Sequence, residues 1–202
     1  MTTIRAVLFD FSGTLFRLEH DSLAAHAGLM RALTAPVGAF QDLDADAWAR
    51  RDLDADLHRE LHVSALAKAG AADPVDFYER LCSPPYWQPY PDTAQALGTH
   101  LRVAVVSNTG WDIRAVFDRH HLTGRVDEFV LSYEEGAIKP DPKLFELACE
   151  RLGVEPHEAL MVGDSPEADG GAAAIGCRVE FVDPLPTSDR PDALLRVLHK
   201  HI

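Results

Sequence analysis

The chain has 202 residues, of which 47% are hydrophobic and 25% are charged, and this composition is typical of a folded globular protein and excludes extended disorder. Its formal net charge of −13 repels a phosphate backbone, so we expect no nucleic-acid partner. Because no apolar run approaches the roughly 18 residues that span a bilayer and no basic and apolar leader opens the sequence, we expect a cytoplasmic protein without a membrane partner.

Short apolar runs that each end at a polar or acidic residue predict buried parallel strands. These runs are residues 4–9, 101–108, 128–132, 159–164 and 177–183. Helical patterns lie between or beside them, at residues 92–100, 113–121, 141–153, 166–175 and 191–200. Strands that alternate with helices at this spacing predict an α/β fold, in which helices cover both faces of a parallel sheet and form three layers. Ligands of such sheets bind at the carboxyl ends of the strands.

Residues 17–90 interrupt this alternation, because they are rich in Ala, Leu, Asp, His and Arg and contain no convincing β-branched run. We therefore predict one α/β core made of residues 1–16 and 91–202, and a mostly helical insertion of residues 17–90. The insertion begins directly after the first strand, so we expect it to lie over the carboxyl end of the sheet. A lid at that position would exclude water and select substrates.

Asp10 ends the first predicted strand and is followed by a turn that contains Ser12, Gly13 and Thr14. An acid before a glycine-containing turn can present its carboxylate beside backbone N–H groups that hold a phosphate. On its own, an acid at a strand end is more often an ordinary turn residue. The interpretation therefore depends on which residues stand at the ends of the other strands.

Polar side chains of matching chemistry come after three other predicted strands. They are Ser107 and Asn108, Lys139, and the pair Asp164 and Asp169. Phosphoryl transfer requires a nucleophile, a cation that neutralises the phosphoryl oxygens and positioned hydrogen-bond donors, and this set supplies all of them. The glycine before Asp164 and the second acid after it favour a metal site, whereas the Asn108 side chain is better explained as the cap of the next helix.

Four motifs in this order resemble those of the haloacid dehalogenase superfamily of hydrolases, over the core segments 4–16 and 91–183. The motifs are DFSGT at 10–14, SN at 107–108, KPDP at 139–142 and GDSPEAD at 163–169. The resemblance implies a Rossmann-like core with a small helical cap inserted after the first strand. It also implies a small phosphorylated metabolite as the substrate, and a reaction through an aspartyl-phosphate.

Residue roles are implied by the same resemblance. Asp10 would be the nucleophile, Ser107 would hydrogen-bond the phosphoryl group, and Lys139 would neutralise both nucleophile and phosphate. The substrate-binding set would comprise Gly13, Thr14, Ser107, Asn108 and Lys139. An Mg²⁺ ion would be held by the carboxylates of Asp10, Asp164 and Asp169 and by the backbone carbonyl of Ser12.

Ser12 departs from the family pattern, which usually has a second acid at this position. That acid protonates the leaving oxygen and then deprotonates the attacking water. A serine hydroxyl cannot do so near neutral pH, and loss of a general acid or base typically costs about 10²–10⁴ in rate. Three outcomes are compatible with serine: a substrate with a good leaving group, a phosphoryl-enzyme that reacts slowly or with an acceptor other than water, or binding without turnover.

A catalytically weak ligand- or protein-binding module on the same scaffold is the main alternative to a phosphatase or phosphotransferase. A 2-haloacid dehalogenase also lacks the second acid, but such relatives work without metal and typically lack the acid that this chain keeps at Asp164. A phosphonate-cleaving relative would use a lysine of the insertion to form a Schiff base. Lys68 is the single lysine there, and its place near a predicted helix end is unremarkable for a cation.

His58 and His62 would share one helical face, and His20 and His26 lie elsewhere in the insertion. The pair could ligate a metal ion, or it could replace the missing proton shuttle, because imidazole titrates near neutrality. Without a nearby third ligand, a solvated helix face is the better interpretation.

Four aromatic residues could line the substrate entrance, although packing at a hinge is the more common role for such residues. They are Tyr86, Trp87, Tyr90 and Trp111.

The cysteines have no paired or metal-type spacing, which favours reduced, buried thiols; they are Cys82, Cys149 and Cys177. The sequence leaves a monomer and a homodimer equally open.

Overall fold

The computed structural model describes residues 3–24, 28–30 and 44–202. Its main sheet has five parallel strands in the order β5-β4-β1-β6-β7. The strands are β1 (Ala6–Phe9), β4 (Arg102–Ser107), β5 (Glu128–Leu131), β6 (Ala159–Gly163) and β7 (Arg178–Phe181). Each predicted apolar run contains one of these strands, so the predicted parallel α/β fold is confirmed.

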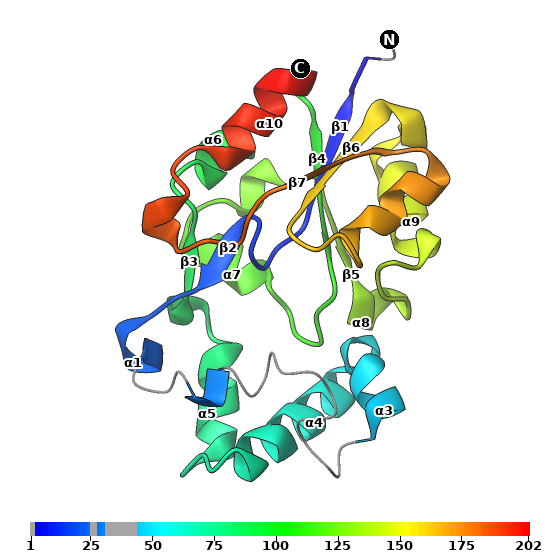
Figure 1. The fold of residues 1–202 in the computed structure, drawn as a ribbon. Coiled ribbons are helices and arrows are strands. Elements are labelled where there is room, and N and C mark those ends of the chain that lie inside the picture. Colours follow the sequence, from blue (N-terminus) through cyan, green and yellow to red (C-terminus); the bar gives the residue numbers. More distant parts are fainter. Residues whose placement is uncertain (1–2, 25–27, 31–43) are drawn as a thin grey trace.

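Helices cover both faces of this sheet (Figure 1). One face carries α6 (Thr93–Ala96), α7 (Arg114–Arg119) and α10 (Ala193–His201), and the other carries α9 (Pro142–Leu152) and the 3₁₀ helix η6 (Asp169–Ile175). Successive residues of a strand point to opposite faces. In β1, Val7 and Phe9 therefore pack in the first core, whereas Ala6 and Leu8 pack against α9.

The helix α9 has the expected signals at both ends. The Asp141 carboxylate accepts a hydrogen bond from the Lys143 N–H, Pro142 occupies the first turn, and Gly153 ends the helix in the left-handed conformation. Two other helices differ from the prediction. The helix expected at residues 92–100 is limited to Thr93–Ala96, and the one expected at 166–175 is a 3₁₀ helix from Asp169.

The residues of the predicted insertion form small helices at the carboxyl end of the sheet, below the core in Figure 1. They are α1 (Asp21–Ala24), α3 (Ala45–Ala49), η2 (Arg51–Leu53), α4 (Ala55–Lys68), α5 (Pro74–Leu81) and η3 (Pro84–Tyr86). Helices α4 and α5 pack through their own apolar cluster, which includes Leu66, Phe77 and Leu81. None of the helices among the described residues combines the length and apolarity needed to cross a membrane.

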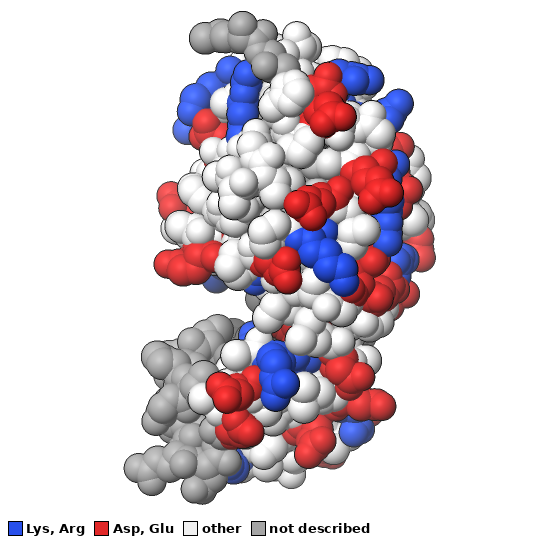
Figure 2. All heavy atoms as spheres, turned by 90° about the vertical axis from the view of Figure 1, so that its right-hand side faces the viewer, with Lys and Arg blue, Asp and Glu red and all other residues white. Residues whose placement is uncertain are grey.

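A two-stranded antiparallel sheet joins the two ends of the insertion, and the sequence did not predict it. It pairs β2 (Phe16–Leu18) with β3 (Trp87–Pro89), with Phe16 opposite Pro89. Strands of three residues are too short for an alternating pattern to be distinguished from chance, so the sequence gives no strand signal here. Figure 2 shows acidic and basic side chains interspersed over both the core and the insertion on the face it presents.

Candidate active site

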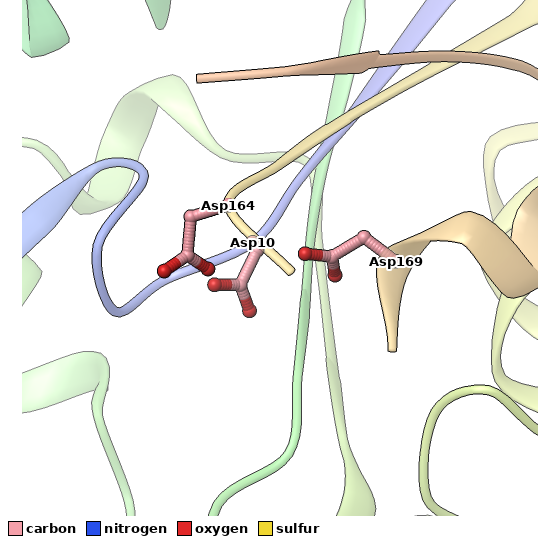
Figure 3. Close-up of side chains that lie close together, drawn as sticks. All are labelled: Asp10, Asp164 and Asp169. Carbon is pink, nitrogen blue, oxygen red and sulfur yellow. The ribbon is translucent and has the colours of Figure 1, made fainter. Parts of the chain in front are cut away.

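Three acidic side chains meet at the carboxyl edge of the parallel sheet (Figure 3). Asp10 follows β1, Asp164 follows β6, and Asp169 begins η6. One carboxylate oxygen from each lies within 4.8 Å of those of the other two. Asp10 is only 6% exposed, and Asp169 is fully buried. The structure therefore brings together the three acids that the sequence singled out from two separate motifs, with Asp10 from one and Asp164 and Asp169 from the other.

Lys139 lies between two of these acids. Its Nζ is 2.6 Å from Asp10 Oδ1 and 2.6 Å from Asp169 Oδ1, and the residue is 5% exposed. Burial acts to lower the pKa of Lys139, but contact with the two carboxylates outweighs it and leaves that pKa raised. The lysine is therefore a fixed positive charge in direct contact with the candidate nucleophile.

Asp10 responds to burial in the opposite direction. Desolvation raises the pKa of its carboxyl group above the ordinary value, Lys139 acts to lower it, and the nearby Asp169 and Asp164 raise it further. Burial likewise raises the pKa of Asp164. Three acids that share one lysine thus leave this edge short of positive charge.

The shortage of positive charge at this edge makes it suitable for a divalent cation such as Mg²⁺. Mg²⁺ prefers carboxylate and carbonyl oxygens, and it would supply the missing positive charge among closely spaced carboxylates. Asp169 already accepts hydrogen bonds at both oxygens, at Oδ1 from Lys139 and at Oδ2 from the Ser165 N–H at 3.0 Å. The residue set fits the ion, and Asp169 has the additional task of holding Lys139.

Asn108 holds the backbone of Lys139 and does not cap a helix. Its Oδ1 accepts the Lys139 N–H at 2.7 Å, and its Nδ2 donates to the Lys139 carbonyl at 3.0 Å. The expectation of a helix cap is wrong, because α7 begins only at Arg114 and the intervening loop carries Asn108 away from its start. Asn108 also lines the cavity described below, so its predicted role in substrate binding stays a prediction.

The turn after Asp10 is shaped by a glycine. Gly13 has a φ of +78°, and a Cβ at this residue would lie 2.3 Å from Asp164 Oδ2, so other residues would be both strained and too large. The Gly13 N–H donates to the Phe16 carbonyl at 2.7 Å, which leaves it engaged within the turn. Ser12 is exposed and Thr14 is fully buried; the predicted contacts of Gly13 and Thr14 with substrate stay predictions.

Arg190 holds this turn from behind, and sequence reasoning missed it. The guanidinium donates to the Gly13 carbonyl at 2.6 Å and to the Thr14 carbonyl, and it stacks on the Tyr90 ring at 3.1 Å from the centroid. The residue is 3% exposed. It lies in an irregular segment before α10, with no motif around it, so no local signal could have identified it.

A cavity of about 250 Å³ lies between this edge and the insertion. Core residues Ser12, Ser107 and Asn108 line one part of it, together with Phe11, Trp87 and Trp111. The Trp87 and Trp111 rings are 6.0 Å apart, and their role as a substrate entrance stays a prediction. The other two predicted aromatics lie elsewhere, since Tyr86 packs on His20 and Tyr90 under Arg190.

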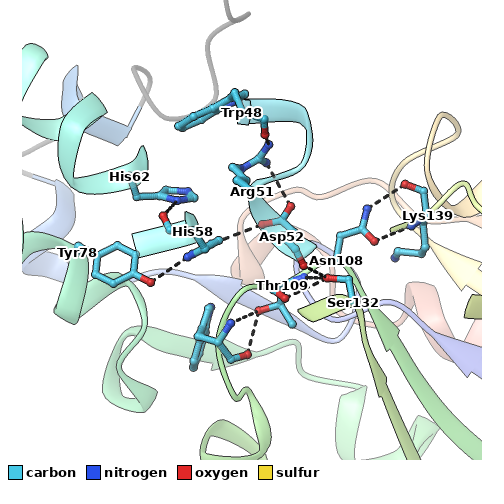
Figure 4. Close-up of polar contacts among 11 residues, drawn as sticks. Trp48, Arg51, Asp52, His58, His62, Tyr78, Asn108, Thr109, Ser132 and Lys139 are labelled. Carbon is cyan, nitrogen blue, oxygen red and sulfur yellow. Dashed lines mark hydrogen bonds and ion pairs between the residues drawn. The ribbon is translucent and has the colours of Figure 1, made fainter. Parts of the chain in front are cut away.

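His58 and His62 also line this cavity and are not on a solvated face, so that expectation is wrong. Their rings are 4.0 Å apart, and His58 is 8% exposed. His58 Nδ1 is 2.9 Å from the Tyr78 hydroxyl, and His62 Nδ1 is 2.7 Å from the His58 carbonyl (Figure 4). Burial lowers the pKa of His58 to about 2 and that of His62 to about 4. Both imidazoles are therefore neutral near pH 7.

The remaining candidates of the insertion are peripheral or undescribed. Lys68 is exposed in the last turn of α4 and does not line the cavity. His20 is exposed, with its Nδ1 at 2.9 Å from Ser22 Oγ, and His26 lies outside the described residues. The cysteines have free thiols, of which Cys149 and Cys177 are buried and Cys82 is partly buried.

Comparison with known proteins agrees with the motifs. The family model of the haloacid dehalogenase-like hydrolases matches residues 4–176. The phosphoserine phosphatase of Thermus thermophilus is 36% identical over 113 residues, which make up 53% of this chain and 44% of that protein. The chain thus spans about half the length of such curated relatives, which also include a 2-haloacid dehalogenase of a Pseudomonas species.

Solved structures of both kinds are similar over nearly the whole chain. A HAD phosphatase from Thermococcus onnurineus is 27% identical, with 89% of this chain and 86% of that chain covered and a TM-score of 0.59. The L-2-haloacid dehalogenase of Xanthobacter autotrophicus, with chloropropionic acid covalently bound, is 27% identical, with 96% and 83% covered and a TM-score of 0.69. On these matches, the chain belongs to the haloacid dehalogenase-like hydrolases.

Proposed function

We propose that this protein is a Mg²⁺-dependent phosphatase or phosphotransferase that acts on a small phosphorylated metabolite through an aspartyl-phosphate at Asp10. The observation that carries the proposal is the contact of Lys139 with Asp10, next to Asp164 at the carboxyl edge of the sheet. The phosphatases among its relatives support the same activity. We include in the proposal a cytoplasmic location and residues 17–90 as the cap of the site.

The acid-rich edge favours a phosphoryl group over a carbon–halogen bond. A phosphate ester carries negative charge into a site with three carboxylates, so it needs a metal ion to neutralise that charge. Displacement of a halide from carbon by Asp10 would make no use of Asp164, which crowds the nucleophile and raises its pKa. The acid cluster is therefore better explained by a phosphorylated substrate.

In the proposed reaction, an Asp10 carboxylate oxygen attacks phosphorus while the bond from phosphorus to the leaving oxygen breaks. Lys139 favours the ionised form of Asp10 and orients it, and the Ser107 hydroxyl at the end of β4 donates to a phosphoryl oxygen. Asp10, Asp164 and the Ser12 carbonyl, with Asp169 beside them, would hold Mg²⁺, which would neutralise charge on the phosphoryl oxygens. Water or another acceptor then takes the phosphoryl group from Asp10.

The test is hydrolysis of acetyl phosphate and p-nitrophenyl phosphate with added Mg²⁺ by the wild type, Asp10→Asn and Ser12→Asp. We expect the wild type to favour acetyl phosphate, whose leaving group needs no proton, and Asp10→Asn to be inactive. Ser12→Asp should raise the turnover of substrates with poorer leaving groups, because an acid at this position can donate a proton. If no variant releases phosphate and fluoroberyllate does not bind in the presence of Mg²⁺, the proposal fails and a binding module is favoured.

Dehalogenation is the second candidate, because the chain also resembles a dehalogenase whose structure holds a covalent adduct. It is tested in the same samples by chloride release from 2-chloropropionate, with and without EDTA. Chloride release that survives EDTA, with no phosphate release from either phosphate substrate, would replace our proposal with this one.

A further inference from the structure

Asp52 is an acid of the insertion that opens onto the same cavity as Ser12 and Ser107. It belongs to η2, and its side chain is 13% exposed. Its Oδ1 lies 3.5 Å from His58 Nε2, and its Oδ2 lies 3.6 Å from Arg51 Nη2 (Figure 4). Among the described residues, 3–24, 28–30 and 44–202, the Asp52 carboxyl group has no closer polar partner than these two. The group is thus enclosed but only loosely paired.

The backbone of Asp52 is fixed to the core beside the candidate phosphate site. The Ser132 hydroxyl donates to the Asp52 carbonyl at 2.6 Å and accepts the Thr109 N–H at 2.8 Å (Figure 4). Thr109 directly follows Ser107 and Asn108 at the end of β4. Ser132 therefore ties the acid of the insertion to the loop that would bind the phosphoryl group.

Close packing reinforces this link. A Cβ on Gly110, the residue after Thr109, would lie 2.2 Å from His58 Cβ. The backbone of the core loop thus lies directly against α4, and His58 in turn lies beside Asp52. The position of Asp52 relative to the core is consequently set by contacts from both its backbone and its neighbouring side chain.

Asp52 also has the chemistry that a proton donor requires. The titratable groups of the insertion that line the cavity are Arg51, Asp52, His58, His62, Tyr78 and Cys82. Arg51 carries a permanent charge, the pKa values of both histidines are too low, and burial raises the pKa of Tyr78 and of Cys82, the latter to about 11. Burial raises the pKa of Asp52 above its ordinary value, opposed by Arg51. Among the described residues of this set, Asp52 is the carboxylic acid, and a raised pKa favours the protonated form that a general acid must have.

The direction of the proposed reaction points toward this acid. In a displacement at phosphorus, the leaving oxygen lies roughly in line with the nucleophile and on the opposite side of the phosphoryl group. A phosphoryl group on Asp10 would therefore direct its leaving oxygen away from the sheet edge, toward the cavity under the insertion. Ser12, which is exposed at that cavity, has no acidic proton to give.

We infer that Asp52 is the general acid of this chain and takes the part that an acid at residue 12 plays in other family members; the inference rests on the proposed function. As the bond from phosphorus to the leaving oxygen breaks, that oxygen takes the proton of the Asp52 carboxyl group and departs as an alcohol. In the second step water attacks the phosphoryl-Asp10 group, the Asp52 carboxylate accepts its proton, and inorganic phosphate and the Asp10 carboxylate are released.

The experiment compares Asp52→Asn with the wild type on substrates that differ in their need for a proton. The probes are acetyl phosphate, p-nitrophenyl phosphate and an alkyl phosphate such as glycerol phosphate, each with Mg²⁺. We expect the alkyl phosphate to lose about 10²–10⁴ in kcat/KM and acetyl phosphate to lose at least ten times less. Asp56→Asn, an exposed acid in the first turn of α4, is the matched control and should change neither.

The same variant in a Ser12→Asp background separates chemistry from folding. With an acid restored at residue 12, Asp52→Asn should cost the alkyl phosphate far less than it costs in the wild type, because the proton has a second source. A merely structural role would give equal losses in both backgrounds and on all three substrates, and this result would overturn the inference while the phosphatase proposal stands. If the wild type and Ser12→Asp turn over none of the substrates, both fall together.

Discussion

The acids at the sheet edge and the histidines of the insertion are both buried, but they differ in their hydrogen-bond partners, because Asp10 and Asp169 are hydrogen-bonded to a permanent positive charge. Lys139 Nζ lies 2.6 Å from Asp10 Oδ1 and 2.6 Å from Asp169 Oδ1. His58 and His62 instead hydrogen-bond a tyrosine hydroxyl and a backbone carbonyl, which are neutral. Lys139 therefore keeps its charge and opposes the rise that burial causes in the pKa of Asp10, whereas the imidazoles of the insertion are neutral near pH 7.

This difference shows that buried groups in the core and in the insertion lie in different electrostatic environments, which suit different catalytic tasks. A group that must attack phosphorus benefits from staying ionised beside a cation, and a group that must deliver a proton benefits from a site that disfavours charge. The two requirements conflict within one small cluster. On our proposals they are met by different segments, with Asp10 from the core as the nucleophile and Asp52 from the insertion as the proton donor.

The largest expected effect comes from removing the cation of the edge. Lys139→Met leaves Asp10 and Asp169 buried without their partner and should lower the free energy of unfolding by about 3–5 kcal/mol. Because the unpaired Asp10 then favours its protonated form in the folded state, the loss should be larger at pH 8 than at pH 5. Urea denaturation at both pH values measures it, and an equal loss at both would show that Lys139 does not act through charge.

The next largest effect is expected when positive charge is added to the acids at the sheet edge. Mg²⁺ at a hundred times its dissociation constant should stabilise the wild type by about 2.7 kcal/mol, seen as a rise in the melting temperature. Asp164→Asn should abolish the rise, whereas the exposed Asp56→Asn should retain it. Equal rises in all three proteins would place the ion away from this edge.

Low pH should lower the free energy of unfolding through the buried His62 of the insertion. The pKa of His62 lies at about 4 in the folded protein against about 6.5 when unfolded, so the unfolded chain binds the proton first. Stability from the neutral imidazole is complete above pH 6.5 and is lost as pH falls toward 4, by an amount on the order of 2 kcal/mol. His62→Gln should flatten the curve of unfolding free energy against pH over this window, and the exposed His20→Gln should leave it unchanged.

The smallest effect concerns the turn that carries the nucleophile. Arg190→Met leaves the Gly13 and Thr14 carbonyls without their donor and should cost about 1–3 kcal/mol of stability, with a lower kcat because Asp10 is less well held. Arg196→Met, which removes an exposed ion pair with Asp192, should cost no more than about 1 kcal/mol. Similar losses in kcat for the two variants would argue against a positioning role for Arg190.

The sequence was sufficient for the parts of the molecule that depend on local pattern. The buried strands appear as apolar runs, and the carboxyl ends of parallel strands meet at one edge. The sequence alone therefore predicts that Asp10, Lys139 and Asp164 lie close together. The end signals of α9 likewise come from adjacent residues, Asp141 and Gly153.

The missed features depend on contacts between distant segments. Asp52 looks like any other acid of an acid-rich insertion, and only its enclosure against Ser132 and His58 distinguishes it. Asn108 has the composition of a helix cap, but its partner is the backbone of Lys139 across the sheet edge. The pairing of β2 with β3 involves segments too short and too polar to show periodicity.

The contact of Arg190 with the nucleophile turn has a consequence for what counts as the working unit of this protein. The family model ends at residue 176, and all four motifs lie within it, yet the guanidinium that holds Gly13 and Thr14 comes from beyond that boundary. A chain shortened to the family range, or a chimaera that exchanges the segment after β7, would keep every recognisable signature and still lose the support of the turn that follows Asp10. The C-terminal segment should therefore travel with the core in any transplantation or minimisation of this enzyme.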